Sequence, residues 1–228
     1  WEIRKAYLML KENQRRFPGF VPNNLLLGAM QTVFGTIPEG YKWITNILGL
    51  RGSIKEGMAN VNKFIESNTP EAKMFREESY YYYCYLMLFI VNKPEETWEF
   101  LERKQLDTKN NYLFALLVAN LSLNNQKAAV GLKVLENRND TGEYADIQYY
   151  NYVRGLLELT RLAPDAHIYL ERFVNNFKGK FYVKECLQRL SWFYYLEGNQ
   201  AAAATYRALI MNKGGLATDA ATQALKEA

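Results

Sequence analysis

Apolar residues recur at intervals of three and four positions along almost the whole chain, and this spacing constrains the fold more than any other feature. It places apolar side chains on one face of an α-helix, whereas the alternation typical of strands is nearly absent. Only 14 glycines and 6 prolines occur in 228 residues, and they lie between the apolar segments. The sequence therefore predicts an all-α fold. The expected helices cover residues 1–16, 22–35, 38–48, 53–67, 70–91, 94–104, 110–124, 126–138, 144–161, 164–177, 181–197, 199–212 and 218–228.

Residues that begin and end helices support these boundaries. Ser53 and Glu56 have the spacing of a capping box, in which the serine hydroxyl accepts a hydrogen bond from a backbone N–H of the first turn. A proline followed by an acidic residue begins four of the segments, at Pro38, Pro70, Pro94 and Pro164. Glycines that we expect to end helices in the left-handed conformation are Gly179, Gly198 and Gly214.

The second half of the chain repeats one plan: a long helix, a tight turn and a shorter helix. The plan occurs at 112–136, 149–174 and 186–210. Aligning Ala129, Ala166 and Ala203 sets the period at about 37 residues, and one further step back reaches the turn near Asn92. The sequence therefore predicts four helix pairs over 70–212, and the short loops predict that paired helices run antiparallel.

The last pair, WFYYLEGNQAAAATYRALI, carries the clearest signature. A small residue, Ala203, lies five positions after Gly198, and the aromatic Tyr206 follows three positions later. This pattern resembles the tetratricopeptide repeat, in which a small residue lets paired helices approach closely and aromatic residues fill the gap to the next repeat. The resemblance implies a right-handed superhelical array of antiparallel helix pairs, although the period exceeds the usual length of about 34 residues.

The first half resembles a more specific family. The segment IPEGYKWITNILGLRGSIKEGMANVNKFIE (37–66) has a proline-led helix, a glycine-rich break and a helix with an internal glycine, Gly57, before a long apolar helix. This order is similar to the tetratricopeptide-repeat-39 family and its fungal relative, the inclusion body clearance protein. Residues 177–199 and 214–228 are similar to the closing helices of that family, whereas 94–140 do not match it. The resemblance implies a helical scaffold without catalytic residues.

The predicted organisation is one continuous structural domain in three parts. An irregular helical bundle (1–69) packs on the tetratricopeptide-like helix pairs (70–212), and a C-terminal helix (213–228) caps the array. The chain begins with Trp1 rather than methionine, which indicates a mature or trimmed chain and leaves its compartment unassigned.

Few residues have the pattern of a catalytic or metal site. His167 is the single histidine and no Cys-x-x-Cys pair exists, so we predict neither a metal site nor histidine-based nucleophilic catalysis. Cys84 and Cys186 each lie in an expected helix, and we predict small buried core residues rather than a disulfide. The chain is therefore predicted not to be an enzyme and to need no cofactor.

The loop before the helix at 53–67 is a candidate anion site. Its residues Arg51, Gly52 and Ser53 precede a helix whose free N–H groups would face a bound anion. The phosphate-binding pattern G-x-x-x-x-G-K-[ST] is absent. The favoured interpretation is a tight turn followed by a helix N-cap.

The charge pattern indicates a solvated surface. The net charge of +4 is scattered, with small basic clusters at Arg15-Arg16 and at 178–184. No nucleic-acid-binding motif accompanies these charges, so no nucleic-acid partner is expected. The uncharged run YYYYCYLMLFIV (80–91) is shorter than the about 20 residues that span a membrane, so no transmembrane segment is expected. We predict instead a helix that its neighbours cover on all sides.

The predicted function is a non-enzymatic interaction scaffold. Stacked helix pairs form an extended concave face, and mixed polar and aromatic side chains there suit a protein or peptide partner. Packing between repeats explains Trp192 and Tyr195 equally well. The tetratricopeptide register places these residues on the concave face: Asn111, Gln148, Asn151, Glu158, Glu185, Gln188, Trp192 and Tyr195.

The alternative is a small-ligand or lipid-binding protein, or an enzyme, with a pocket in the atypical N-terminal helices. The glycine-rich break near Arg51 and the unusual run of tyrosines motivate this hypothesis. A third hypothesis is peripheral contact with a membrane or lipid, suggested by the family resemblance and by the aromatic side chains.

Overall fold

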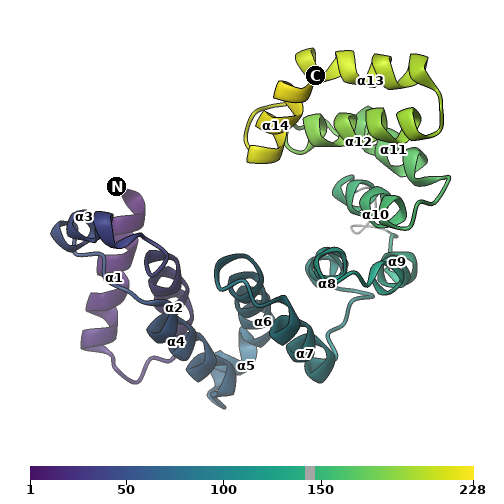
Figure 1. Ribbon diagram of the computed structural model, residues 1–228. Helices are drawn as coiled ribbons and strands as arrows, with labels where there is room; N and C mark the ends of the chain where they lie inside the picture. The colour runs from purple at the N-terminus through teal and green to yellow at the C-terminus, as the bar shows by residue number, and fades with distance from the viewer. Residues whose placement is uncertain (142–146) are drawn as a thin grey trace. The chain divides into compact units, whose positions relative to one another are not determined.

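The computed structural model describes residues 1–141 and 147–228, and this part of the chain contains helices and no strand. The predicted all-α class is confirmed for these residues. The helices gather into two compact units, unit 1 (Trp1–Leu106) and unit 2 (Asp107–Ala228), each with its own buried core (Figure 1). Across the two described ranges, no helix is both long enough and apolar enough to cross a membrane.

Unit 1 contains seven α-helices, a short 3₁₀ helix and a π-helical segment. α2 contacts both α1 and α4, α4 packs on α6, and α7 packs against α6 and η2. The bounds are α1 (Glu2–Arg16), α2 (Pro22–Phe34), the 3₁₀ helix η1 (Glu39–Tyr41), α3 (Lys42–Ile47), α4 (Ile54–Glu66), α5 (Pro70–Met74), α6 (Arg76–Tyr85), the π-helical η2 (Leu86–Ile90) and α7 (Pro94–Lys104).

Unit 2 is built from pairs of helices that are adjacent in sequence. α8 pairs with α9, α10 with α11 and α12 with α13, each pair contacts the next, and α14 folds back onto α12 and α13 (Figure 1). The predicted packing of adjacent helices as pairs is confirmed here. The bounds are α8 (Tyr112–Asn124), α9 (Ala128–Asn137), α10 (Tyr149–Thr160), α11 (Ala166–Asn176), α12 (Val183–Leu196), α13 (Gln200–Asn212) and α14 (Asp219–Glu227).

The predicted helix boundaries agree with the observed ones to within two residues at most positions. The helix expected at 144–161 begins at Tyr149, since residues 147 and 148 are not helical, and the part of this prediction at 144–146 lies outside the described ranges. The helix expected at 70–91 is interrupted twice. Phe75 (φ −100°, ψ 19°) separates α5 from α6, and the last turn from Leu86 has π geometry. Apolar and aromatic residues continue across both breaks, so their spacing does not reveal them.

The starts of the helices test the predicted repeat period. The first helices of the pairs in unit 2 begin at Tyr112, Tyr149 and Val183, which are 37 and 34 residues apart. The same three helices end at Asn124, Thr160 and Leu196, which are 36 residues apart in both intervals, so the period of about 37 residues stays a prediction. Three further features stay predictions. They are the right-handed superhelix, membership of the tetratricopeptide-repeat family, and the division of the chain into 1–69, 70–212 and 213–228.

A small residue brings the paired helices together, but at a different position in each pair. Ala203 lies against α12, where the hydroxyl of Ser191 donates a 3.0 Å hydrogen bond to its carbonyl. In the α8–α9 pair the aligned Ala129 is exposed. Gly131 is buried there instead, and a Cβ on it would lie 2.9 Å from Cβ of Ser122. The predicted equivalence of Ala129 with Ala203 is therefore wrong, because Gly131 is the residue that faces α8.

The closest helix contact of unit 1 is between the backbones of α2 and α4. A Cβ on Gly28 would lie 2.7 Å from the Gly57 carbonyl oxygen, and a Cβ on Gly57 would lie 2.6 Å from the Gly28 carbonyl oxygen. The hydroxyl of Thr32 donates a 2.9 Å hydrogen bond to the same Gly28 oxygen. The two glycines thus let the backbones of α2 and α4 approach closely, because neither glycine carries a side chain at the contact.

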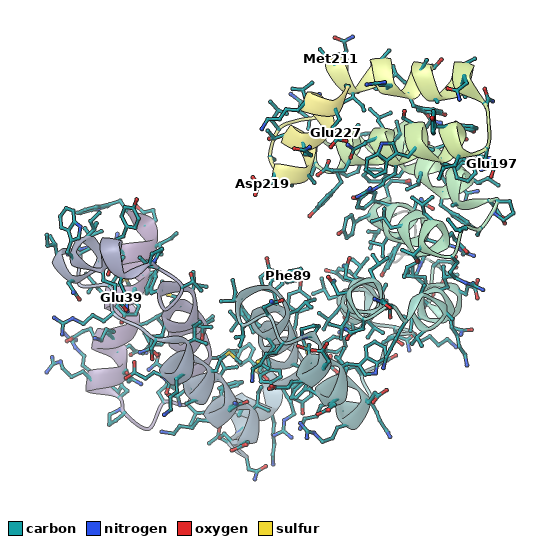
Figure 2. The ribbon with its side chains drawn as sticks, viewed as in Figure 1. Glu39, Phe89, Glu197, Met211, Asp219 and Glu227 are labelled. Atoms are coloured by element: carbon teal, nitrogen blue, oxygen red, sulfur yellow. The ribbon has the colours of Figure 1, made fainter. Side chains whose placement is uncertain are left out.

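The tyrosine-rich run is buried on one side only. Cys84 has no exposed surface, and Tyr83 packs on the Phe100 ring of α7 with 4.3 Å between centroids. Tyr85 and Phe89 are 47% and 53% exposed, and the centroids of their rings lie 4.8 Å apart. Figure 2 labels Phe89. The predicted cover on all sides is therefore wrong, since α7 and the other helices of unit 1 cover only the inner face.

Two of the three predicted glycine helix ends are confirmed. Gly198 (φ 77°) and Gly214 (φ 82°) follow α12 and α13 in the left-handed conformation, which glycine adopts without a steric penalty. Gly179 is not left-handed, because α11 already ends at Asn176 and the next residue, Phe177, is extended.

Both cysteines are free and buried, which confirms their prediction as core residues rather than a disulfide. Burial raises the pKa of the Cys84 thiol to about 12. Burial, with a smaller contribution from the nearby Glu185 charge, also raises the pKa of Cys186. Since the thiolate is the nucleophile, both thiols are held in their unreactive form.

We expect iodoacetamide to modify neither Cys84 nor Cys186 in the folded protein, even as the pH rises from about 7 to about 9, where an exposed thiol becomes largely ionised. Both should react once guanidinium chloride unfolds the chain. Mass spectrometry of the alkylated protein checks this. Modification of either residue under native conditions would contradict the burial described here.

Candidate functional site

Three helices of unit 2 line a groove of about 390 Å³. α12 and α13 contribute most of it, and α14 contributes two residues. We call it the C-terminal groove. Its lining residues are Gln188, Ser191, Trp192 and Tyr195 of α12, Gln200, Ala203, Ala204, Arg207 and Ile210 of α13, and Ala224 and Glu227 of α14.

A tight turn between α12 and α13 positions the two sides of the groove. Gly198 supplies the left-handed residue that ends α12, and Asn199 caps α13 by accepting a 3.1 Å hydrogen bond from the backbone N–H of Ala202. Because the turn is short, Tyr195 at the end of α12 and Gln200 at the start of α13 line the same groove.

The floor of the groove consists mainly of small buried side chains. Ser191, Ala203 and Ala224 are all less than a tenth exposed. The Ser191 hydroxyl already donates its hydrogen bond to the Ala203 carbonyl. The floor therefore presents a largely apolar surface and leaves the hollow unfilled, since no long side chain extends from it.

Two large aromatic side chains form the exposed wall. Trp192 is 44% exposed and Tyr195 is 61% exposed, and both line the groove. The guanidinium of Arg189 lies 4.5 Å from the centroid of the Trp192 ring, within range of a cation–π interaction. Tryptophan, tyrosine and arginine are the residues most enriched where binding energy concentrates in protein interfaces.

Polar contacts hold α14 against α12 and α13. One of them is made by Gln188, which the sequence predicted as a partner-binding residue. The Gln188 amide donates a 2.5 Å hydrogen bond to the Glu227 carboxylate (Figure 2 labels Glu227). Arg207 donates a 2.8 Å hydrogen bond to the Glu227 carbonyl, and Gln223 donates a 2.6 Å bond to its carboxylate. Gln188 is buried as a result, so it supports α14 rather than facing solvent.

Glu185, one turn before Gln188, lies beneath the start of α14. Its side chain is buried, and one carboxylate oxygen accepts a hydrogen bond from the Thr218 hydroxyl, which also caps α14. The other oxygen is buried and has no hydrogen-bond partner among the described residues. Contact of Glu185 and Gln188 with a partner stays a prediction, and α14 covers both residues in this structure.

The remaining four predicted residues make local contacts and do not line the C-terminal groove. The Asn111 side chain caps α8 by accepting hydrogen bonds from the N–H groups of Leu113 and Phe114 at 3.1 and 3.2 Å. The Asn151 amide donates a 3.0 Å hydrogen bond to Gln148. Glu158 lies 4.0 Å from the Arg154 guanidinium. Binding of a partner by these four residues stays a prediction.

The loop formed by Arg51, Gly52 and Ser53 is a packed turn. The Ser53 hydroxyl accepts a 3.1 Å hydrogen bond from the Glu56 N–H, which confirms the predicted N-cap. The Arg51 carbonyl accepts a hydrogen bond from the Tyr7 hydroxyl. A Cβ on Gly52 would lie 2.5 Å from the Gln31 carbonyl oxygen, so this loop lies directly on α2. Anion binding by these three residues stays a prediction.

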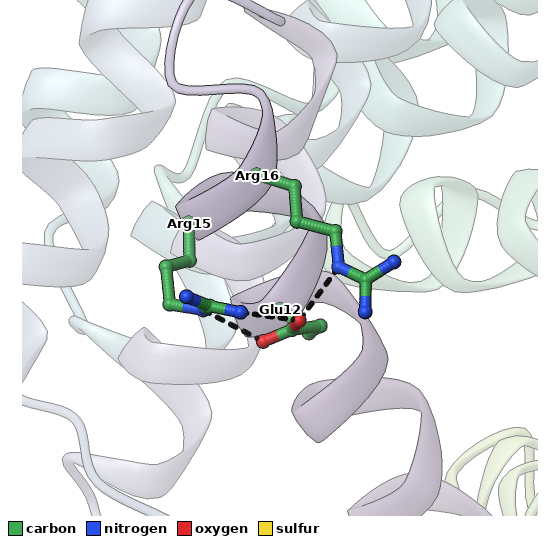
Figure 3. Close-up of polar contacts among 3 residues, drawn as sticks. All are labelled: Glu12, Arg15 and Arg16. Carbon is green, nitrogen blue, oxygen red and sulfur yellow. Dashed lines mark hydrogen bonds and ion pairs between the residues drawn. The ribbon is translucent and has the colours of Figure 1, made fainter.

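The positive charge of the basic pair at the end of α1 is partly offset by one carboxylate. Arg15 donates hydrogen bonds of 2.8 and 2.9 Å to Glu12, and Arg16 donates one of 2.7 Å (Figure 3). The hydrogen bonds from Arg15 lower the pKa of Glu12 most, the hydrogen bond from Arg16 adds to this effect, and the pKa falls to about 2. The carboxylate therefore stays ionised near neutral pH and reduces the local positive charge.

The single histidine packs against an aromatic ring. The His167 ring stacks on Phe193 with 4.9 Å between centroids, and Nδ1 lies 2.9 Å from the Pro164 carbonyl oxygen. Within 1–141 and 147–228, no three His, Cys, Asp or Glu side chains are grouped so that they could hold a metal ion.

Sequence reasoning missed the contribution of the second helix to the groove. Gln200, Ala203 and Arg207 are spaced as i, i+3 and i+7, which places them on one face of α13. That spacing was available in the sequence. The sequence also predicted that a C-terminal helix caps the array, but not that two residues of this helix, Ala224 and Glu227, line a groove.

Comparison with known proteins identifies no relative. No protein-family model matches the chain, no curated protein matches it, and no solved structure matches it. The resemblance to the tetratricopeptide-repeat-39 family therefore stays a prediction.

Proposed function

We propose that this protein is a non-enzymatic interaction scaffold that binds an extended segment of a protein partner in the C-terminal groove. The observation that carries the proposal is the exposed aromatic wall of Trp192 and Tyr195 beside a floor of small buried residues. Large rings that remain exposed supply contact area on binding, and a floor of alanine and serine lets a peptide backbone approach closely.

The polar residues of the groove suit the same kind of ligand. Gln200 is exposed and carries an amide that can both donate to and accept from a peptide backbone. Arg189 keeps a positive charge beside the Trp192 ring. The tetratricopeptide resemblance favours a binding scaffold as well, and on that proposal the surface would continue along a concave face that includes Gln148 and Asn151.

The proposal is tested by affinity capture from the native host with matched double variants. We expect proteins that co-purify with the wild type to fall at least about tenfold, equivalent to about 1.4 kcal/mol of binding free energy, when Trp192→Ala and Tyr195→Ala are combined. Both side chains are substantially exposed, so this variant should keep its helicity by circular dichroism.

The matched control combines Tyr41→Ala and Trp43→Ala in unit 1, because these rings are each 62% exposed and lie outside the groove. Capture should be unchanged in this control. If the Trp192 and Tyr195 variant retains the same proteins as the control, the groove is not the binding surface.

A further inference from the structure

A second pocket lies in unit 1, and neither the sequence nor the proposed function assigns a role to it. Residues of α2, α4, α5 and α6 enclose a space of about 300 Å³ around Phe75, the residue at the break between α5 and α6. We call it the Phe75 pocket. It is lined by six apolar residues, Phe20, Pro22, Leu25, Leu26, Phe64 and Phe75, and by two acidic residues, Glu71 and Glu78.

The interior of the Phe75 pocket is apolar and incompletely covered. Leu25 and Phe64 are almost fully buried and form its base. Phe20, Leu26 and Phe75 are each more than 40% exposed around it. Burying a leucine or phenylalanine side chain in such a space removes apolar surface from water, which favours binding. The pocket therefore has the size and surface to take one bulky apolar side chain of a ligand.

The lining of the pocket includes two carboxylates for which residues 1–141 and 147–228 supply no ion-pair partner. Glu71 and Glu78 are exposed, and neither side chain forms an ion pair or hydrogen bond with the described residues. The segment 66–78 contains four glutamates and only two basic residues. One of the basic residues, Arg76, donates a 3.1 Å hydrogen bond to the Ser67 carbonyl.

The two carboxylates come from different helices. Glu71 lies in α5 and Glu78 in α6, on the two sides of the break at Phe75. Both line the same pocket as the Phe75 ring, so the apolar lining and the two negative charges belong to one site.

The geometry points to the Phe75 pocket as a binding site for a basic amphipathic peptide segment. One bulky apolar side chain of the segment enters the pocket, and lysine or arginine side chains on either side of it pair with Glu71 and Glu78. The positive charges supply complementarity and specificity, while burial of the apolar side chain supplies most of the affinity. The site lies in unit 1 and is independent of the C-terminal groove.

A random peptide library displayed on phage, selected against the whole chain, tests this site. We expect enriched peptides with a large apolar residue flanked by lysine or arginine. Their affinity should fall about tenfold or more in the Glu71→Gln, Glu78→Gln variant and should weaken as ionic strength rises. The substitutions keep side-chain size, so the variant should unfold at the same temperature as the wild type.

Two controls separate this site from other sites. Glu95→Gln combined with Glu99→Gln removes two exposed carboxylates from α7 and should leave affinity unchanged. Trp192→Ala combined with Tyr195→Ala removes the wall of the C-terminal groove and should also leave these peptides bound, whatever its effect on protein capture.

Three outcomes would overturn the inference. The selection yields no basic apolar peptides; or the peptides bind the Glu71 and Glu78 variant as tightly as the wild type; or sedimentation shows that the chain dimerises through this pocket, with dimerisation lost in Phe75→Ser. In the last case a second copy is the occupant.

Discussion

Replacing Gly57 by alanine is expected to destabilise unit 1 by about 3 kcal/mol or more, although alanine is the better helix former by about 1 kcal/mol. The new Cβ would lie 2.6 Å from the Gly28 carbonyl oxygen and would also collide with the side chain and backbone N–H of Thr32. Backbone atoms cannot rotate away as a flexible side chain can, so α2 and α4 must separate. Denaturant titration followed by circular dichroism measures the free energy of unfolding.

Gly40→Ala is the matched control. A Cβ on Gly40 meets no atom within 4 Å, and the residue is exposed in the short helix η1. Its free energy of unfolding should stay within about 0.5 kcal/mol of the wild-type value. A Gly57→Ala protein as stable as this control would mean that α2 and α4 do not meet at their backbones.

Phe173→Ala is expected to destabilise unit 2 by about 3–5 kcal/mol. Phe173 of α11 is completely buried, and its ring lies 5.2 Å from Tyr152 of α10 and 4.8 Å from Phe177, measured between centroids. The substitution removes the transfer free energy of a whole aromatic ring and leaves a cavity that surrounding helices fill only in part. Thermal and denaturant unfolding should both shift to milder conditions.

The same chemical change at Phe181 serves as its control, because that ring is 56% exposed in the loop before α12. Phe181→Ala should change the free energy of unfolding by about 0.5 kcal/mol or less. Equal effects at the two positions would contradict the assignment of Phe173 to the core of unit 2.

The local rules that predict helices worked because they act over a few residues. The spacing of apolar residues, the Ser53 cap and the left-handed Gly198 and Gly214 each depend on neighbours within about two turns, and the structure shows all of them. The breaks in the helix predicted at 70–91 could not be read in this way, because Phe75 and Leu86 are as compatible with a continuous helix as their neighbours.

The candidate site was predicted only in part. Gln188, Trp192 and Tyr195 all line the C-terminal groove, and their predicted place on the concave face of a superhelical array stays a prediction. The register alone did not show that α14 folds over Gln188 and the neighbouring Glu185. The alternative hypothesis placed a pocket in the N-terminal helices, but the residues of the Phe75 pocket were not predicted, because they come from separate stretches of unit 1.

The sequence by itself determined that this chain is helical, where most of its helices begin and end, and that adjacent helices pack as pairs, since propensity, capping and short loops act locally. Only the tertiary structure decided which small residue faces its partner helix, which aromatic side chains stay exposed, and which polar residues α14 covers. These features depend on contacts between residues far apart in sequence, such as Gly28 with Gly57 and Gln188 with Glu227, and no local pattern specifies such pairs.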